Sequence, residues 1–109
     1  TKSFNIEEYL KKLDINSVAI YGIGMLGKQL YMQLKGTSIK IEYGIDQYVG
    51  KFGDDIVVYR PDIDSFNNVD AIVITAYDEK NIENKLKSKT DAKIIRLSCM
   101  IDWLWRNGN

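Results

Sequence analysis

The stretch that decides the fold is YGIGMLGKQL at 21–30, which carries the spacing G-x-G-x-x-G at Gly22, Gly24 and Gly27. A short apolar run, SVAIYG at 17–22, precedes the glycines, and a helical pattern, MLGKQLYMQLK at 25–35, follows them. The spacing alone is a weak signal. Between a strand and a helix, however, it is typical of a loop whose backbone approaches a phosphate group.

Each glycine has a predicted role in such a loop. Gly22 lets the chain turn sharply after the strand, and Gly24 has no side chain to keep a phosphate away from the backbone. Gly27 lies on the same helical face as Leu30 and Leu34, so its missing Cβ lets the helix approach the sheet. The alternative is a vestigial site in which the glycines serve packing only.

The first N–H groups of the predicted helix favour an anion. Those of Met25, Leu26, Gly27 and Lys28 lack acceptors within the helix, and the helix dipole adds partial positive charge. Lys28 is either a phosphate contact or a solvated surface residue. Asp46 stands 19 residues beyond Gly27, at the end of a second predicted strand. Its carboxylate could accept hydrogen bonds from ribose hydroxyls, and its charge would repel a 2′-phosphate, so we do not expect NADP.

The remaining segments alternate between strand and helix patterns. Asn5 is expected to cap a first helix, and Asp78 a later one. Beyond the glycine unit we expect strands at 38–46, 56–59, 69–76 and 92–98, a loop at 47–55, and helices at 78–89 and 99–107. This order predicts an α/β fold. The chain, 1–109, would be a single Rossmann-like domain, with a parallel sheet of about five strands in the order 3-2-1-4-5 flanked by helices.

Other residues have weaker claims to a site. Thr75 and Tyr77 follow the fourth predicted strand, at the edge where ligands of open α/β sheets bind, so we count both as candidate binding residues. Tyr77 either stacks on a base or packs on its own loop. Tyr31 and Lys35 form Y-x-x-x-K, but on the wrong helix for a dehydrogenase pair, which favours chance. Cys99 is expected to be inert core or boundary.

Composition excludes several classes of protein. Fifteen Lys and Arg balance fifteen Asp and Glu, which gives no bias toward nucleic acid, and no apolar run approaches the ~18 residues of a membrane span. The chain has no histidine and a single cysteine, so we expect no catalytic residue, no metal site and a cytoplasmic location. Because the chain starts at Thr1, we expect a domain cut from a longer protein.

Five segments resemble a known group of proteins. VAIYGIGMLGKQLYMQLKG, IEYGID, IVVYRPDI, VDAIVITAYD and AKIIRL, within roughly residues 17–98, resemble the Rossmann-like domains of bacterial polysaccharide and glycan biosynthesis proteins. These include the N-terminal domain of sugar acyltransferases and domains attached to glycosyltransferases, sugar methyltransferases or nucleotide-sugar dehydratases. The resemblance implies that Gly22, Gly24, Gly27 and Asp46 help to hold a UDP-sugar. The acyltransferase β-helix and its catalytic histidine are absent from this sequence. A weaker resemblance is to the NAD-binding domains that regulate potassium channels, and the V-V-Y-x-P-D turn of this sequence argues against it.

These observations lead to three hypotheses. The first is a binding module for a nucleotide-containing small molecule, NAD(H) or a UDP-sugar, that is not catalytic alone and belongs to a glycan-biosynthesis protein, possibly a transferase. The second is an interaction module with a vestigial site, which forms a homodimer or docks on an attached catalytic domain through the helix that bears Trp103 and Trp105. The third, a small oxidoreductase, would need hydride transfer without a second domain.

Overall fold

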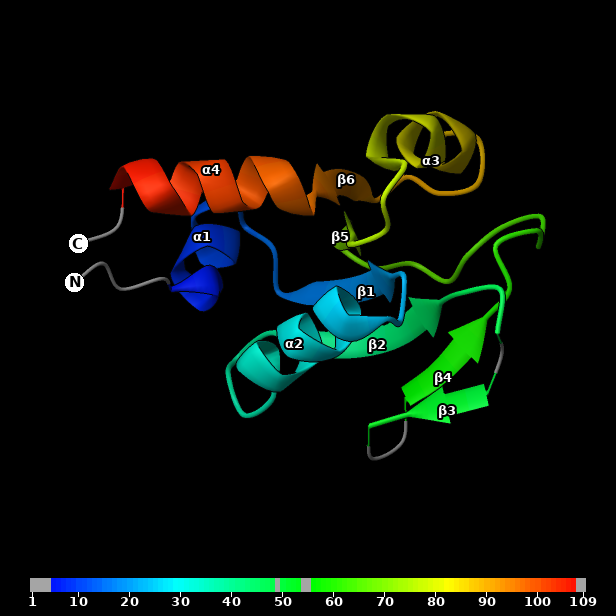
Figure 1. Cartoon of the computed structure of the whole chain (residues 1–109), viewed down its shortest axis with the longest axis horizontal. Coiled ribbons are helices and arrows are strands. Elements are labelled where there is room, and N and C mark those ends of the chain that lie inside the picture. The colour runs from blue at the N-terminus through cyan, green and yellow to red at the C-terminus, as the bar shows by residue number, and fades with distance from the viewer. Residues whose placement is uncertain (1–4, 49, 54–55, 108–109) are drawn as a thin grey trace.

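The computed structural model describes residues 5–48, 50–53 and 56–107. Within them the chain forms four helices and one six-stranded sheet (Figure 1). The strands are β1 Ser17–Tyr21, β2 Lys40–Ile45, β3 Gly50–Phe52, β4 Ile56–Tyr59, β5 Ala71–Ile74 and β6 Lys93–Arg96. The helices are α1 Ile6–Lys12, α2 Met25–Leu34, α3 Glu79–Leu86 and α4 Leu97–Asn107.

The predicted strand order is confirmed. The sheet runs β3-β4-β2-β1-β5-β6, and every neighbouring pair is parallel except β3 with β4. Numbered along the chain, the parallel strands therefore lie in the order 3-2-1-4-5. The central strand β1 pairs with both β2 and β5, and β5 is buried along its whole length. Strands buried on both faces are continuous apolar runs, which is why these segments could be recognised in the sequence.

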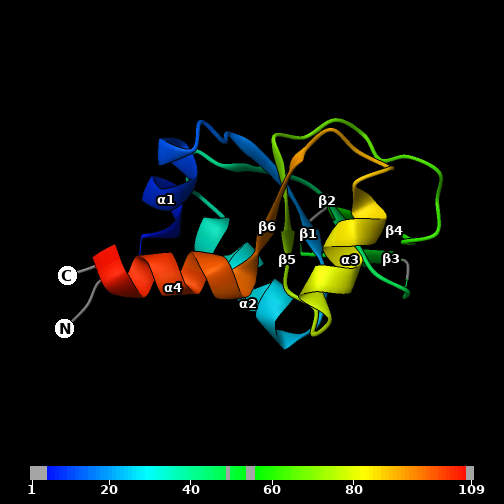
Figure 2. The same cartoon turned by 90° about the horizontal axis from the view of Figure 1, so that it is seen from above.

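Helices cover both faces of the sheet, as Figure 2 shows. Along β1, Val18 and Ile20 face a core built with α1, α2 and α4, whereas Ala19 faces a second core with α3 and the chain between β4 and β5. This alternation follows from the two-residue period of a strand. The carboxyl ends of the parallel strands meet at one edge, between the two layers of helices.

The expected loop at 47–55 is wrong in part, because it contains β3. This short strand runs antiparallel to β4 at the edge of the sheet. Phe52 holds it in place by packing edge-to-face on Tyr31 of α2, with ring centroids 5.0 Å apart. Gly53 follows with a φ of 65°, so the chain reverses at a glycine. Positions 49, 54 and 55 of the expected loop lie outside the described residues.

The helix starts differ in how well they were predicted. Asn5 caps α1, since its side chain accepts a 2.9 Å hydrogen bond from the Glu8 N–H. Asp78 precedes α3, but its carboxylate accepts a hydrogen bond from the Asn81 side chain and none from the helix backbone, so the predicted cap is wrong. The last helix begins at Leu97, directly after β6, two residues earlier than expected.

Candidate functional site

The glycine loop joins β1 to α2, and the fold itself requires two of its glycines. Gly22 has a φ of 97°, and its N–H donates a 2.8 Å hydrogen bond to the Ile45 carbonyl of β2. A Cβ added to Gly27 would lie 1.9 Å from the Gly22 carbonyl oxygen, so a side chain there would push α2 off the loop. These are the turn and the close helix approach that the sequence predicted for the two residues.

Gly24 is different, because nothing in the structure requires a glycine there. A Cβ on Gly24 would meet no atom within 4 Å, and its φ is −89°. It is the N-cap of α2 and contributes no side-chain capping bond. Lys28 is the first helix residue whose N–H has an acceptor, the Gly24 carbonyl at 3.0 Å, so the expectation of a free N–H is wrong for this residue. Within the described chain nothing accepts the N–H groups of the three preceding residues, so the helix end is open to an anion.

Asp46 lies beside this loop and already has two backbone partners. Its Oδ2 accepts a 2.8 Å hydrogen bond from the Ile23 N–H, and its Oδ1 accepts one of 3.1 Å from the Tyr48 N–H. The carboxylate therefore fixes both the glycine loop and the turn after β2. Each carboxylate oxygen can accept a second hydrogen bond, so the predicted ribose contact stays a prediction.

A cavity of about 370 Å³ brings these groups together. Gly24, Lys28 and Asp46 line it from the glycine side, and the β3–β4 hairpin closes it. Its full lining is Ile23, Gly24, Lys28, Asp46, Tyr48, Gly50, Phe52 and Val58. The volume lies at the lower end of the range of about 300–1,000 Å³ for small-molecule sites. An open helix end, a lysine, a carboxylate and aromatic side chains thus share one hollow at the carboxyl edge.

The sequence missed the wall made by the hairpin. Tyr48, Phe52 and Val58 reach the cavity because β3 folds back along β4, a pairing hidden in a segment interpreted as loop. The available signal was Phe52, an apolar residue between two glycines that would have little reason to be there in a solvated loop. Tyr48 is 86% exposed, so its ring is accessible at the rim.

Thr75 and Tyr77 do not line this cavity. They follow β5, on the other side of β1 from β2. The Thr75 hydroxyl is 2.7 Å from the Gly22 carbonyl oxygen and 2.9 Å from that of Tyr21, so it holds the glycine turn. Tyr77 is fully exposed. The side chains of Met25 and Leu26 point into solvent or toward another groove, so only their backbone N–H groups remain candidates for binding. Binding at all four residues stays a prediction.

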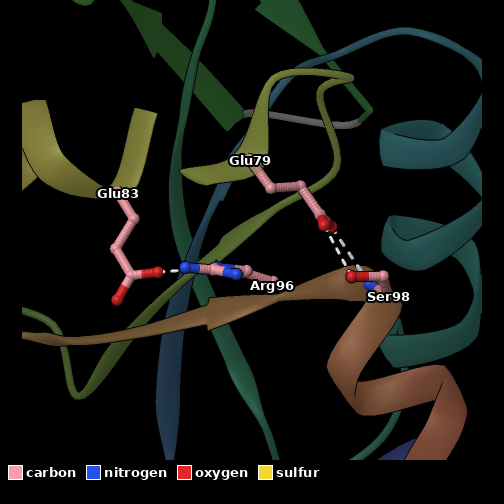
Figure 3. A network of polar contacts seen from close by, with 4 residues as sticks. All are labelled: Glu79, Glu83, Arg96 and Ser98. Atoms are coloured by element: carbon pink, nitrogen blue, oxygen red, sulfur yellow. Dashed lines mark hydrogen bonds and ion pairs between the residues drawn. The ribbon is translucent and has the colours of Figure 1, made fainter. Parts of the chain in front are cut away.

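The other half of the carboxyl edge is closed by a polar clamp between α3 and the β6–α4 junction, drawn in Figure 3. The Arg96 Nε lies 2.7 Å from Glu83 Oε1, and this contact raises the Arg96 pKa. Glu79 accepts hydrogen bonds from the Ser98 N–H at 3.0 Å and from its hydroxyl at 2.5 Å. Glu79 thus caps the first turn of α4 from outside, which explains why the helix starts early.

The C-terminal helix has one packed and one exposed tryptophan. Trp103 packs on Tyr9 of α1 with ring centroids 5.1 Å apart, and the Lys12 ammonium lies 5.2 Å from its ring centre. Trp105 is 58% exposed. Cys99 is exposed as well, so the expected place in the core or at its boundary is wrong, because this face of α4 turns away from the sheet.

Residues 5–48, 50–53 and 56–107 hold neither a metal-ligand cluster nor a membrane-spanning helix. No group of three or more His, Cys, Asp and Glu side chains in them could hold a metal ion. No helix among them is long and apolar enough to cross a bilayer. Comparison with protein-family models, with curated proteins and with solved structures gives no match.

Proposed function

We propose that this domain binds a nucleotide-containing small molecule, NAD(H) or a UDP-sugar, in the cavity beside the glycine loop. The observation that carries the proposal is Gly24. Gly22 and Gly27 are explained by the fold, but the space in front of Gly24 is open and borders the unpartnered N–H groups of α2. A glycine at this point keeps the backbone accessible to a phosphate group.

The other walls of the cavity suit the rest of such a ligand. Lys28 supplies a second positive group for a diphosphate, and Asp46 has lone pairs left for ribose hydroxyls. Tyr48, at the rim, offers a ring on which a base could stack. The resemblance to glycan-biosynthesis proteins favours a UDP-sugar, and we infer a binding module that supplies no catalytic residue of its own.

The test is a thermal-shift and calorimetric screen of the purified domain with NAD, NADH, NADP, UDP and UDP-N-acetylglucosamine. A ligand at 100 times its Kd adds about 2.7 kcal/mol, which raises Tm by about 10 °C for a domain of this length. Gly24→Val fills the open space and should abolish the shift. Met32→Val is the matched control, since Met32 is an exposed α2 residue outside the cavity lining. If no ligand shifts Tm, or if both variants lose the shift equally, the proposal fails.

A second function, an interaction module, has one observation in its favour. A mainly apolar groove of about 240 Å³ lies between α2 and α4, and two of its lining side chains, Leu26 and Ile101, are each about half exposed. Apolar grooves of this kind often mark interfaces. Concentration-dependent dimerisation in analytical ultracentrifugation, together with a silent ligand screen, would favour this function over nucleotide binding.

A further inference from the structure

A second cavity of about 340 Å³ lies on the opposite face of the sheet, between α3 and the chain that follows β4. In Figure 2, α3 and α2 are on opposite sides of the strands, so the two cavities face different layers. The turn after β2 separates them: Asp46 lines the first cavity and its neighbour Gln47 lines the second. They share no lining residue, so a ligand in one does not define the other.

Two lysine side chains bring positive charge to the lining of the second cavity. Lys85 and Lys89 both line it, and no described acidic side chain lies within ion-pair distance of either ammonium. Lys89 Nζ donates one hydrogen bond, of 2.8 Å, to the Pro61 carbonyl, which leaves two donors on the ammonium. The one carboxylate in the lining, Asp62, is 3.7 Å from the guanidinium of Arg60.

The remaining lining residues supply donors, acceptors and an apolar wall. Tyr21 places its phenol here from the end of β1. Burial, and to a lesser extent Asp46, raise the Tyr21 pKa above its ordinary value, and the protonated hydroxyl can donate a hydrogen bond. Gln47 adds an amide, and Ile82 of α3 adds an apolar surface. Two ammonium groups suit an anionic end of a ligand, whereas a phenol, an amide and a carboxylate suit hydroxyl groups.

We propose that this cavity is a separate binding site for a small organic phosphate that carries hydroxyl groups, such as a phosphorylated sugar. Lys85 and Lys89 contact the phosphate, while Tyr21, Gln47 and Asp62 contact the hydroxyl groups. The arrangement does not depend on the nucleotide proposal, because none of these residues lines the first cavity.

Lys85 is the residue to substitute, because Lys89 also donates a hydrogen bond to the Pro61 carbonyl in the chain after β4. The ¹⁵N-labelled domain is titrated with glucose 1-phosphate, inorganic phosphate and glucose, and backbone amide shifts are followed by NMR. We expect saturable shifts at Gln47, Ile82 and Lys85 with glucose 1-phosphate, and weaker binding of the other two probes. Lys85→Gln should weaken binding about tenfold, the loss expected for one charge-assisted contact.

Lys80→Gln is the matched control, because Lys80 is an exposed lysine on the same helix and does not line the cavity. It should leave the affinity unchanged. Equal weakening by both variants would mean general electrostatic attraction and would overturn the proposal. Shifts confined to residues 24–28 would place the phosphate in the first cavity and also overturn it, as would the absence of any saturable shift.

Discussion

Gly24 and Gly27 lie three residues apart in one motif, yet the structure predicts a large loss of stability from alanine at Gly27 and little change from alanine at Gly24. At Gly27 the new Cβ would lie 1.9 Å from the Gly22 carbonyl oxygen, far inside the 3.4 Å at which ordinary contacts begin. The obstacle is backbone, so no side chain can rotate away. At Gly24 the new Cβ would meet nothing within 4 Å.

The expected magnitudes follow from these contacts. Overpacking against backbone costs about 3 kcal/mol, and alanine in a helix interior returns about 1 kcal/mol relative to glycine. Gly27→Ala should therefore lower the free energy of unfolding by about 2 kcal/mol or more, and Tm by about 10 °C. At Gly24, alanine is a poorer N-cap than glycine but also restricts the unfolded chain, so the two effects cancel to within about 1 kcal/mol.

The assay is urea unfolding followed by tryptophan fluorescence, with Tm from differential scanning calorimetry. Gly27→Ala with the stability of the wild type would refute the close approach of α2 to the loop. Gly24→Ala as unstable as Gly27→Ala would mean that the fold requires all three glycines. That second result would also remove the observation on which the nucleotide proposal depends.

Two further predictions concern the buried Tyr43 side chain and the Thr75 hydroxyl. Burial, with smaller effects of Tyr59 and Glu42, raises the Tyr43 pKa from 10.0 to about 12. Because the folded-state pKa is the higher one, the stabilisation by the neutral phenol is complete below pH 10 and is lost as the pH rises toward 12. We therefore expect the free energy of unfolding to fall less steeply over this range in Tyr43→Phe than in the wild type. Equal slopes for the two proteins would contradict a role of the Tyr43 phenol in this pH dependence. Thr75→Val removes the hydroxyl that bonds the Gly22 carbonyl and should lower the free energy of unfolding in urea by about 1 kcal/mol. Thr75→Ser keeps a hydroxyl and should retain most of that stability. Equal losses in the two variants would point to packing of the methyl group as the cause.

The parts of the fold that sequence could predict are those set by local pattern. The strand Ser17–Tyr21, the glycine turn and the helix Met25–Leu34 follow one another in the chain, and apolar periodicity with glycine spacing is enough to define them. The strand order followed because parallel strands with right-handed crossovers leave few topologies. Asn5 was found for the same reason, since its partner Glu8 is three residues away.

What the sequence did not predict depends on contacts between distant residues. The strand Gly50–Phe52 is too short to show a pattern, and its place is set by a ring contact with Tyr31 on another element. The start of α4 depends on Glu79, 19 residues before Ser98, and local propensity cannot report such a cap. The two backbone bonds of Asp46 are likewise a result of tertiary approach.

The two backbone hydrogen bonds of Asp46 also limit the kinds of ligand that the first cavity could bind. The Asp46 carboxylate already accepts hydrogen bonds from Ile23 and Tyr48, and a carboxylate can offer a ligand only further acceptor capacity. A group placed beside it must therefore donate a hydrogen bond, as ribose hydroxyls do. A 2′-phosphate would instead bring its own negative charge next to the carboxylate. The anion-binding groups, the N–H groups of α2 and Lys28, lie on the glycine side of the same hollow. A ligand that satisfies both sides must carry its phosphate groups and its free hydroxyls at different ends. NAD(H) and UDP-sugars have free hydroxyl groups on the adenosine or uridine ribose, whereas NADP carries a phosphate at the 2′ position of its adenosine ribose. NADP in the same screen is therefore the internal control for contact between Asp46 and that ribose.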